Sequence, residues 1–254
     1  MLRIILISLV FSLTLSAKYT NCGFVDKNYS DICKDVVKKG VSYDYANRFL
    51  LSYFKTKKYD EITWKYIQPK YISVHRAKEK KANNILVQYI PRVIKHLKRY
   101  EKVYDYSEKR FHVNREIIAS ILLKETKLGK IPLKHDAFIV FNTILTRAKP
   151  TTERAKRLIR MSKTNMSSII NYCYKNKIQP NRCNLPSSFA GAVGIAQFMP
   201  NSFIYAQGYK KKYANLNNMS DAIVSTAKFL NQKTGFKKMI VYSKMKNIKN
   251  VESQ

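Results

Sequence analysis

Apolar residues recur at helical spacing along most of the chain. In residues 44–54, 85–100, 118–122 and 221–230, apolar side chains stand three or four positions apart, and few segments alternate as strands do. The sequence has no internal repeat, and no linker rich in proline, glycine or serine divides it. The pattern predicts a mainly α fold, with Ser220 as the N-cap of the last of these helices.

Two further stretches, residues 74–82 and 145–160, are polar and basic. We interpret them as connectors or as exposed faces. At 254 residues with 45% hydrophobic content, the chain is long enough to bury a substantial core.

The first 17 residues form a separate kind of segment. Arg3 supplies a positive start, residues 4–15 an apolar run, and Ala17 a small residue at a cleavage position. The run of about a dozen apolar residues is shorter than the roughly 20 that a membrane-spanning helix needs. We therefore expect a removable secretory signal, with no stable membrane span after its removal. Residues 18–21, KYTN, do not resemble the small apolar residues that precede a lipidated cysteine.

Four cysteines follow the signal, at Cys22, Cys33, Cys173 and Cys183. An even number in an exported chain favours disulfides, and the two short spacings favour Cys22–Cys33 and Cys173–Cys183 among the three possible connectivities. Free buried thiols are the alternative. A zinc site is disfavoured because no Cys-x-x-Cys spacing or neighbouring histidine supports it.

The formal net charge of +32 is extreme. In a cytosolic protein it would suggest nucleic acid as a partner, but export makes cell-wall polymers and lipid surfaces the available polyanions. We therefore expect wall association and no nucleic-acid partner. An equally weighted alternative is a lysine-rich composition that simply gives a solvated surface.

Residues 111–130, FHVNREIIASILLKETKLGK, contain the first candidate for chemistry. Asn114 is a suitable N-cap, Glu116 complements the positive helix start, and Gly129 stands where a C-terminal cap belongs, so a helix over 115–127 is predicted. Glu125 follows Ile121 by four positions and Leu122 by three, which predicts a carboxylate on the buried stripe.

Burial and a position in the last helical turn are both expected to raise the pKa of Glu125, which would suit it to protonate a glycosidic oxygen. An ion pair with one of the many lysines or arginines is the structural alternative. Most glycosidases use a second carboxylate, and candidates for it are few because residues 154–220 contain no Asp or Glu. Asp136, Glu153 and Asp221 remain, and Asp136 and Asp221 are more typical of helix starts. A mechanism with a single acid fits better.

The segment AGAVGIAQFMP at 190–200 holds two of the chain's seven glycines. Glycine allows φ > 0 and close approach of a backbone or a ligand, so the pair Gly191 and Gly194 in an apolar frame predicts a tight wall.

Four motifs then occur in order: ETKLG at 125–129, DA at 136–137, SFAGAVGIAQFMPNS at 188–202 and DAI at 221–223. Together they resemble the membrane-bound lytic transglycosylase B type of peptidoglycan enzyme, with most force over residues 106–235. The resemblance implies a lysozyme-like helical catalytic region at 106–254, preceded by an N-terminal helical region at 18–105. It also implies cleavage of the bond between N-acetylmuramic acid and N-acetylglucosamine.

By this resemblance Glu125 is the single catalytic acid and base, which closes a 1,6-anhydro ring on the muramyl residue. Ser188 and Gln197 match positions that contact the substrate or the acid. Gly191 and Gly194 would bring the backbone close to the sugar, which makes Gly191 a further substrate-binding candidate. Ser188 as a cap and Gln197 as a turn-stabilising side chain are the structural alternatives. The implied partners are peptidoglycan glycan strands and, as recruiting machinery, a secretion or division apparatus.

Two departures from the family pattern change the expectations. The segment 207–218 is short and basic where relatives carry an Asp-rich, calcium-loop-like insert, so we expect no metal and no cofactor. Near the C-terminus only Tyr242 matches the Tyr-Asn pair that lines the site in the family, and its structural alternative is helix packing. The competing functions are a muramidase-type hydrolase with a second carboxylate and a noncatalytic wall-binding protein. The expected location is periplasmic or cell-wall associated.

Overall fold

The computed structural model describes residues 20–56, 59–72, 74, 78, 85–236 and 239. Helices dominate it, as predicted, and the strands form one small antiparallel pair in which His135 lies opposite Ser187. The elements, in chain order, are α1 (Lys27–Lys38), α2 (Tyr43–Thr56), α3 (Glu61–Tyr66), η1 (Ile85–Tyr89), α5 (Ile90–Arg99), α6 (Glu101–Phe111), α7 (Arg115–Thr126), β1 (His135–Asp136), α8 (Ala137–Arg147), α9 (Glu153–Lys175), η2 (Pro180–Arg182), β2 (Pro186–Ser187), η3 (Pro200–Tyr205) and α10 (Met219–Lys233).

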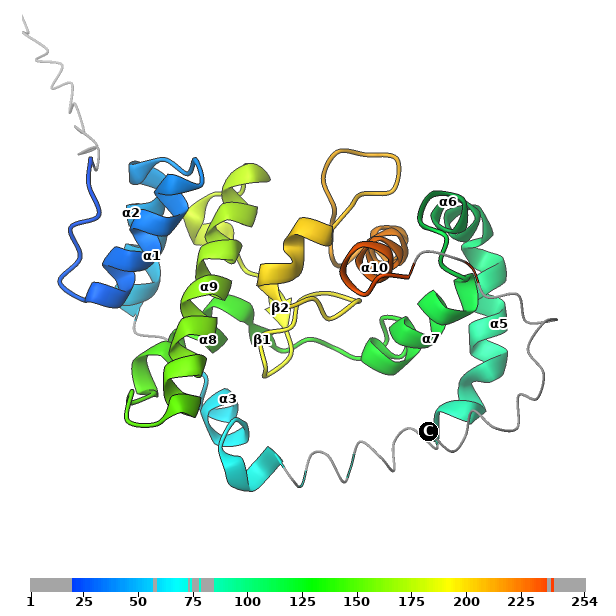
Figure 1. Ribbon diagram of the computed structural model, residues 1–254, viewed down its shortest axis with the longest axis horizontal. Helices are drawn as coiled ribbons and strands as arrows, with labels where there is room; N and C mark the ends of the chain where they lie inside the picture. The colour runs from blue at the N-terminus through cyan, green and yellow to red at the C-terminus, as the bar shows by residue number, and fades with distance from the viewer. Residues whose placement is uncertain are drawn as a thin grey trace, which may run out of the picture.

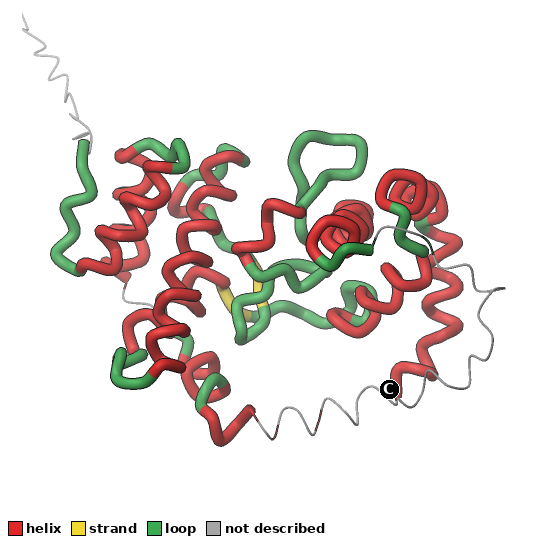
Figure 2. The backbone as a smooth tube through the Cα atoms, in the orientation of Figure 1, coloured by secondary structure: helices red, strands yellow, loops and turns green. Residues whose placement is uncertain are grey.

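The helices form two groups with the strand pair between them (Figure 1). α9 packs against α1 and α8 in one group, whereas α10 packs against α6 and α7, and α5 against α7, in the other. The loop that follows β2 runs through the space between the two groups, as the tube in Figure 2 shows. One continuous set of buried residues extends through both groups. The loop with the glycine motif is therefore central to the fold.

α9 is the longest helix, with 23 residues, and its periodicity explains its position. Thr152 caps it by accepting a hydrogen bond from the Ala155 N–H, and Met166, Ile169, Ile170 and Cys173 follow one another on one buried face. The interpretation of 145–160 as connectors or exposed faces is confirmed in both senses. Residues 148–152 connect α8, which ends at Arg147, to α9, which begins at Glu153, and much of the rest is an exposed helix face.

Two predicted helix starts differ in the structure. Residues 85–100 form a 3₁₀ turn followed by α5, because Pro91 lacks an N–H and fits only in a first helical turn. α10 begins at Met219 with Asn218 as its N-cap, two residues before the predicted Ser220, since the Asn218 side chain accepts from the Asp221 N–H. Residues 75–77 and 79–82 of the predicted connector lie outside the described residues.

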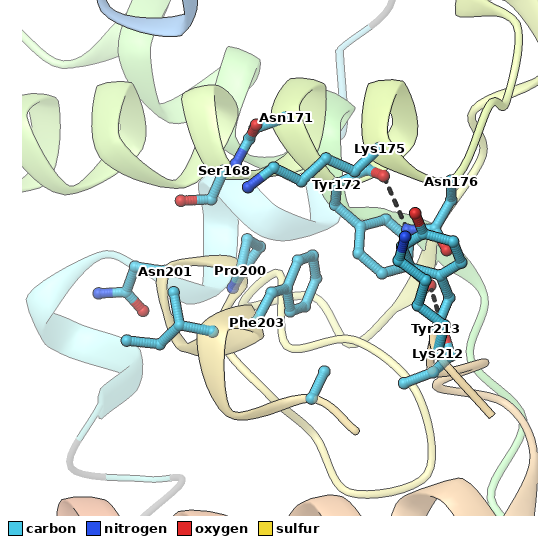
Figure 3. A pocket seen from close by; sticks show the side chains of 13 residues that line it. Ser168, Asn171, Tyr172, Lys175, Asn176, Pro200, Asn201, Phe203, Lys212 and Tyr213 are labelled. Carbon is cyan, nitrogen blue, oxygen red and sulfur yellow. Dashed lines mark hydrogen bonds between the residues drawn. The ribbon is translucent and has the colours of Figure 1, made fainter. Parts of the chain in front are cut away.

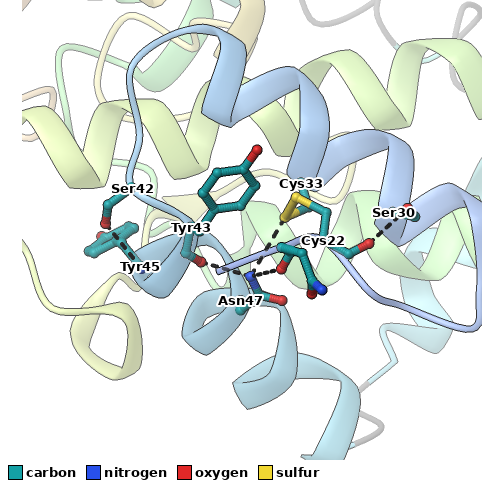
Figure 4. The surroundings of a disulfide bond; sticks show 8 residues. Cys22, Ser30, Cys33, Ser42, Tyr43, Tyr45 and Asn47 are labelled. Atoms are coloured by element: carbon teal, nitrogen blue, oxygen red, sulfur yellow. Dashed lines mark hydrogen bonds between the residues drawn. A yellow bond between two sulfur atoms is a disulfide. The ribbon is translucent and has the colours of Figure 1, made fainter. Parts of the chain in front are cut away.

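The disulfides Cys22–Cys33 and Cys173–Cys183 confirm the predicted connectivity. The first joins the N-terminal segment to α1, and Figure 4 shows Asn47 of α2 beside it. The Asn47 side-chain amide donates to the Asn21 carbonyl at 2.7 Å and to the Tyr43 carbonyl at 2.8 Å. The N-terminal segment is thus fixed to the helices by a covalent bond and by hydrogen bonds.

Candidate active site

α7 is held firmly at its start. Asn114 is its N-cap, as predicted, and Arg115 joins it to α6 through the carboxylates of Glu108 and Asp105. The backbone N–H and the side-chain Nε of Arg115 both donate to Glu108 at 2.8 Å. The side-chain hydrogen bonds, to Glu108 above all and to Asp105, hold the pKa of the Arg115 guanidinium above its ordinary value. The helix that carries Glu125 therefore starts from a fixed point.

α7 ends in three consecutive residues with left-handed backbone, Lys127, Leu128 and Gly129. The predicted cap at Gly129 was wrong by two residues, since Lys127 is the C-cap. The Lys127 N–H donates to the Leu123 carbonyl at 2.8 Å and the Leu128 N–H to the Leu122 carbonyl at 3.0 Å, as in a Schellman-type ending. The chain turns sharply away directly after Glu125 and Thr126.

The predicted burial of Glu125 was wrong, because its side chain is exposed. The buried stripe of α7 consists of Ile118, Ala119, Leu122, Leu123 and Thr126. The predicted stripe ran through Ile121, Leu122 and Glu125. The observed stripe is shifted by one residue, which corresponds to a rotation of about 100° around the helix axis. Glu125 consequently lies beside the packed face, where a bound ligand can reach it.

Thr126, the residue after Glu125, links α7 to the glycine motif. Its buried hydroxyl donates to the Ile195 carbonyl at 2.8 Å and accepts from the Gly129 N–H at 3.0 Å. The Ile195 N–H in turn donates to the Leu216 carbonyl at 3.0 Å. These bonds bring together segments 69 and 21 residues apart, and we call them the Thr126–Ile195 seam. The sequence contained a signal for it, because Thr126 is a polar residue at i+4 from Leu122 on the apolar stripe.

The two motif glycines face protein atoms. At Gly191, where φ is +83°, a Cβ would lie 2.5 Å from the Phe141 ring. At Gly194, where φ is +72°, it would lie 2.4 Å from the Leu216 carbonyl oxygen. Both residues therefore need to be glycine for packing and for backbone conformation. The tight wall is confirmed, whereas contact of Gly191 with a sugar remains a prediction.

Ser188 and Gln197 both make hydrogen bonds within the motif. The Ser188 hydroxyl accepts from the Ala192 N–H at 3.3 Å, and the Gln197 side-chain amide donates to the Gly194 carbonyl at 2.9 Å. Gln197 itself has left-handed backbone, with φ of 51°. Both side chains are half-buried, so their structural roles leave them partly accessible to a ligand.

The three alternative carboxylates each have a structural role. Asp136 caps α8 by accepting from the Ile139 N–H at 3.0 Å, and Glu153 pairs with Lys156 in the first turn of α9. Asp221 is 1% exposed, and it accepts from the Tyr209 N–H at 2.9 Å and from the Asn215 N–H at 2.7 Å. Asp136 and Asp221 are thus helix-start residues, as predicted.

A basic cavity of about 380 Å³ adjoins the turn that follows Glu125. Leu128, Gly129 and Ile195 contribute to its wall, and its cations are Arg92, Lys95, Arg99 and Lys130. Four positive side chains beside the end of α7 favour anionic groups there. From the sequence one can predict that basic residues are common, but not that these four lie together. The cavity forms between α5 and the start of α10, which are far apart in the chain.

Other expectations lie beyond these observations. Tyr242 lies outside the described residues. In the part of the chain that the structure describes, no three His, Cys, Asp or Glu side chains are grouped to hold a metal ion, and the expected absence of a metal stays a prediction. Within the same residues, no helix is both long and apolar enough to cross a membrane.

Comparison with known proteins gives a family match over most of the chain. The sequence profile of the Transglycosylase SLT domain matches residues 25–250, which include all four motifs. No curated protein matches the sequence.

Three solved structures share the fold. The lytic transglycosylase SLT35 of Escherichia coli, in complex with bulgecin A, is 20% identical with a TM-score of 0.55, over 84% of this chain and 65% of that one. The soluble lytic transglycosylase SltB1 of Pseudomonas aeruginosa is 22% identical with a TM-score of 0.58, over 80% and 66%. SltB3 of P. aeruginosa, in complex with NAG-anhNAM-pentapeptide, is 15% identical with a TM-score of 0.59, over 80% and 51%. The chain thus spans about half to two thirds of the length of these relatives. The predicted mainly α, lysozyme-like fold is confirmed.

Proposed function

The chain belongs to the Transglycosylase SLT domain family, and from this we propose that it is a lytic transglycosylase of peptidoglycan. Its substrate is the glycan strand, and its product carries a 1,6-anhydromuramyl end. The observation that carries the proposal is the Thr126–Ile195 seam, because Thr126, the residue that follows the exposed Glu125, is hydrogen-bonded to the glycine motif of the family. SltB3, a relative with the same fold, binds a fragment of this chemistry.

In this mechanism Glu125 acts twice. Its carboxylic acid first donates a proton to the glycosidic oxygen, and the bond from that oxygen to the muramyl anomeric carbon breaks. The C6 hydroxyl oxygen of the same sugar then forms a bond to the anomeric carbon, and its proton passes to the Glu125 carboxylate. No water is consumed, and Glu125 returns to its starting state.

A single carboxylate suffices for this reaction because the nucleophile belongs to the substrate. An intramolecular hydroxyl held close to the anomeric carbon has a high effective concentration and does not need an activated water. The structural engagement of Asp136, Glu153 and Asp221 supports this single-acid scheme over a muramidase. A muramidase would need one of them to leave its backbone or lysine partner.

We assign substrate contacts to four further residues. The hydroxyl of Ser188, the amide of Gln197 and the backbone at Gly191 lie in the motif that adjoins Glu125 through the seam. Tyr242 completes the set on the resemblance alone. The glycine packing against Phe141 and Leu216 fixes the path of this backbone, so the polar groups would be preorganised for the sugar.

The protein would act outside the cytoplasm. Two disulfides are typical of exported proteins, and the N-terminal segment has the features of a signal peptide. We propose a periplasmic or wall-associated location, where peptidoglycan is accessible, with recruitment by envelope machinery. A net charge of +32 would hold the protein near the anionic groups of the wall.

Mass spectrometry of the muropeptides released from purified peptidoglycan tests the proposed reaction. Anhydromuramyl products, each one water lighter than hydrolytic products, are expected. Reducing ends would instead identify a muramidase, and a folded protein that binds peptidoglycan without releasing products would be a wall-binding protein. Glu125→Gln should release these products at a greatly reduced rate, whereas the matched control Glu116→Gln, also exposed on α7, should release the same products as the wild type.

A further inference from the structure

A second pocket lies between the C-terminal part of α9, η3 and the loop that precedes α10, with a volume of about 180 Å³ (Figure 3). Ser168, Asn171, Tyr172, Lys175 and Asn176 line it at successive i, i+3 and i+4 positions, which form one face of α9. These residues of α9 lie outside the motifs of the family resemblance, whereas the η3 wall begins with Pro200 and Asn201 at the end of the glycine motif. The strand pair and the glycine loop separate α9 from α7 in Figure 1, so this pocket is not part of the Glu125 site.

The walls of the pocket are fixed by specific interactions. The Tyr172 hydroxyl donates to the Ala214 carbonyl at 3.0 Å, and the rings of Tyr172 and Phe203 are 5.0 Å apart. η3 is attached to α9 by the Asn201 N–H, which donates to the Asn165 side-chain oxygen at 3.0 Å. The Cys173–Cys183 disulfide holds the end of α9. The pocket is therefore preformed.

The loop wall is fixed by Asp221. Its buried carboxylate accepts from the Tyr209 and Asn215 N–H groups on either side of Lys212 and Tyr213, and it pairs with Lys211 at 2.8 Å. Burial, and to a lesser degree the charge of Asp221, raises the pKa of Tyr172. The charge of Asp221 is offset by Lys211.

The pocket combines two kinds of chemistry. The rings of Tyr172 and Phe203 give an apolar surface, and Lys175 and Lys212 supply two exposed ammonium groups. None of the described residues that line it is acidic. The side-chain oxygen of Asn171 is buried and closed off from solvent, so the groups that a ligand in the pocket can reach are the two rings and the two ammonium groups.

We propose that this pocket is a second glycan-binding site, which takes an N-acetylmuramyl sugar whose lactyl carboxylate carries no stem peptide. The aromatic rings would contact the apolar face of the sugar, and Lys175 and Lys212 would pair with its carboxylate. The volume suits about one sugar unit. That this sugar belongs to peptidoglycan rests on the proposed function. The site would hold the enzyme on the strand at a distance from Glu125.

Titration with N-acetylmuramic acid, followed by amide chemical shifts in NMR spectra, tests this site. Shifts are expected at the backbone amides of Lys175, Lys212 and Ala214, which lie in the pocket walls. N-acetylglucosamine, which lacks the carboxylate, should bind these amides about tenfold more weakly. The double variant Lys175→Gln/Lys212→Gln should bind N-acetylmuramic acid more weakly by a similar factor. Both lysines are exposed, so the fold should persist.

Lys38→Gln/Lys233→Gln is the matched control, because it removes the same charge from exposed lysines at the ends of α1 and α10. It should bind like the wild type. No shift at the pocket amides, equal binding of N-acetylglucosamine, or an equal response to inorganic phosphate would overturn the proposal. Neither sugar is cleaved, so these outcomes are independent of the products released from peptidoglycan. Failure of the proposed function is therefore distinguishable from failure of the second site.

Discussion

Glu125 and Asp221 occupy opposite helix ends and have opposite surroundings. Glu125 lies in the last turn of α7, where the helix dipole disfavours an anion, and its side chain is exposed. Asp221 lies in the first turn of α10, where the dipole favours an anion, and it is buried with two backbone donors and Lys211. The position of Asp221 is explained by stability, because the helix dipole and three donors favour its charge. The helix dipole does not favour the charge of Glu125, and we propose that its position serves the function.

Asp221→Asn should have the largest effect on stability. The variant loses the charge that accepts from Tyr209 and Asn215 and leaves Lys211 without its partner, so the free energy of unfolding should fall by about 3–5 kcal/mol. Urea denaturation measures this change. Glu125→Gln should lie within about 0.5 kcal/mol of the wild type in the same experiment, because its side chain is exposed. Equal losses in the two variants would remove the distinction.

Gly194→Ala and Gly191→Ala probe the loop that lies between the two carboxylates. Each should lower the free energy of unfolding by about 2–4 kcal/mol, because positive φ and a close contact both oppose a side chain. The contact at Gly191 is with the ring of Phe141, whereas that at Gly194 is with the backbone at Leu216.

A second substitution separates these two glycines. Phe141→Leu should recover part of the stability lost in Gly191→Ala, since it shortens the side chain that the new Cβ meets. It should recover none in Gly194→Ala, where a carbonyl oxygen is the obstacle. Equal recovery in both backgrounds, measured by thermal unfolding, would contradict the packing explanation.

The buried His96 of α5, the helix that packs against α7, should make the stability of the fold depend on pH. Burial, and to a lesser degree the charge of Arg99, lowers its pKa to about 4, and its ring nitrogen lies 2.9 Å from the Tyr104 hydroxyl. The unfolded chain takes up a proton near pH 6.5 and the folded chain only near pH 4. The contribution of neutral His96 to the free energy of unfolding is therefore complete above pH 6.5 and is lost as the pH falls towards 4. The loss should be about 1–2 kcal/mol after allowance for solvent screening.

Stability measured against pH in the wild type and in His96→Gln tests this expectation. The loss between pH 6.5 and 4 should be smaller in the variant, because the substituted side chain does not titrate. An identical pH profile in both proteins would show that His96 is not the group responsible.

Thr126→Val should lower the free energy of unfolding by only about 1 kcal/mol, the smallest effect among the substitutions of buried residues, because it removes one hydroxyl and keeps the shape of the side chain. The seam fixes Glu125 relative to the glycine motif, so peptidoglycan cleavage should fall more than stability does. Initial rates and urea denaturation on the same preparation compare the two. Thr126→Ser, which keeps the hydroxyl, should retain most of the activity, and equal rates in the two variants would contradict a positioning role.

Several of these features could be predicted from the sequence because they depend on neighbouring residues. The N-cap at Asn114, the helix-start roles of Asp136 and Asp221, and the disulfide pairs all follow from short spacings. The tight wall followed from the need of glycine for positive φ.

The rest depends on contacts between distant residues. The stripe on α7 was misplaced by one residue because Ile117 and Ile121 are as apolar as Ala119 and Leu123, and tertiary packing decides which face is buried. The atoms that exclude a side chain at Gly191 and Gly194 belong to Phe141 and Leu216, which no local pattern connects to them. The pocket beside α9 likewise forms from three separate segments.

The cleavage rate of purified peptidoglycan by Glu125→Gln is the most direct test of the central claim. The amide has nearly the same shape but cannot donate and recover the proton, so the rate should fall by about 10²–10⁴-fold or more. The unfolding midpoint should stay unchanged, and Glu116→Gln should match the wild type in both respects. A Glu125→Gln protein that is folded and still releases anhydromuramyl products at the wild-type rate would contradict the assignment of Glu125 as the acid.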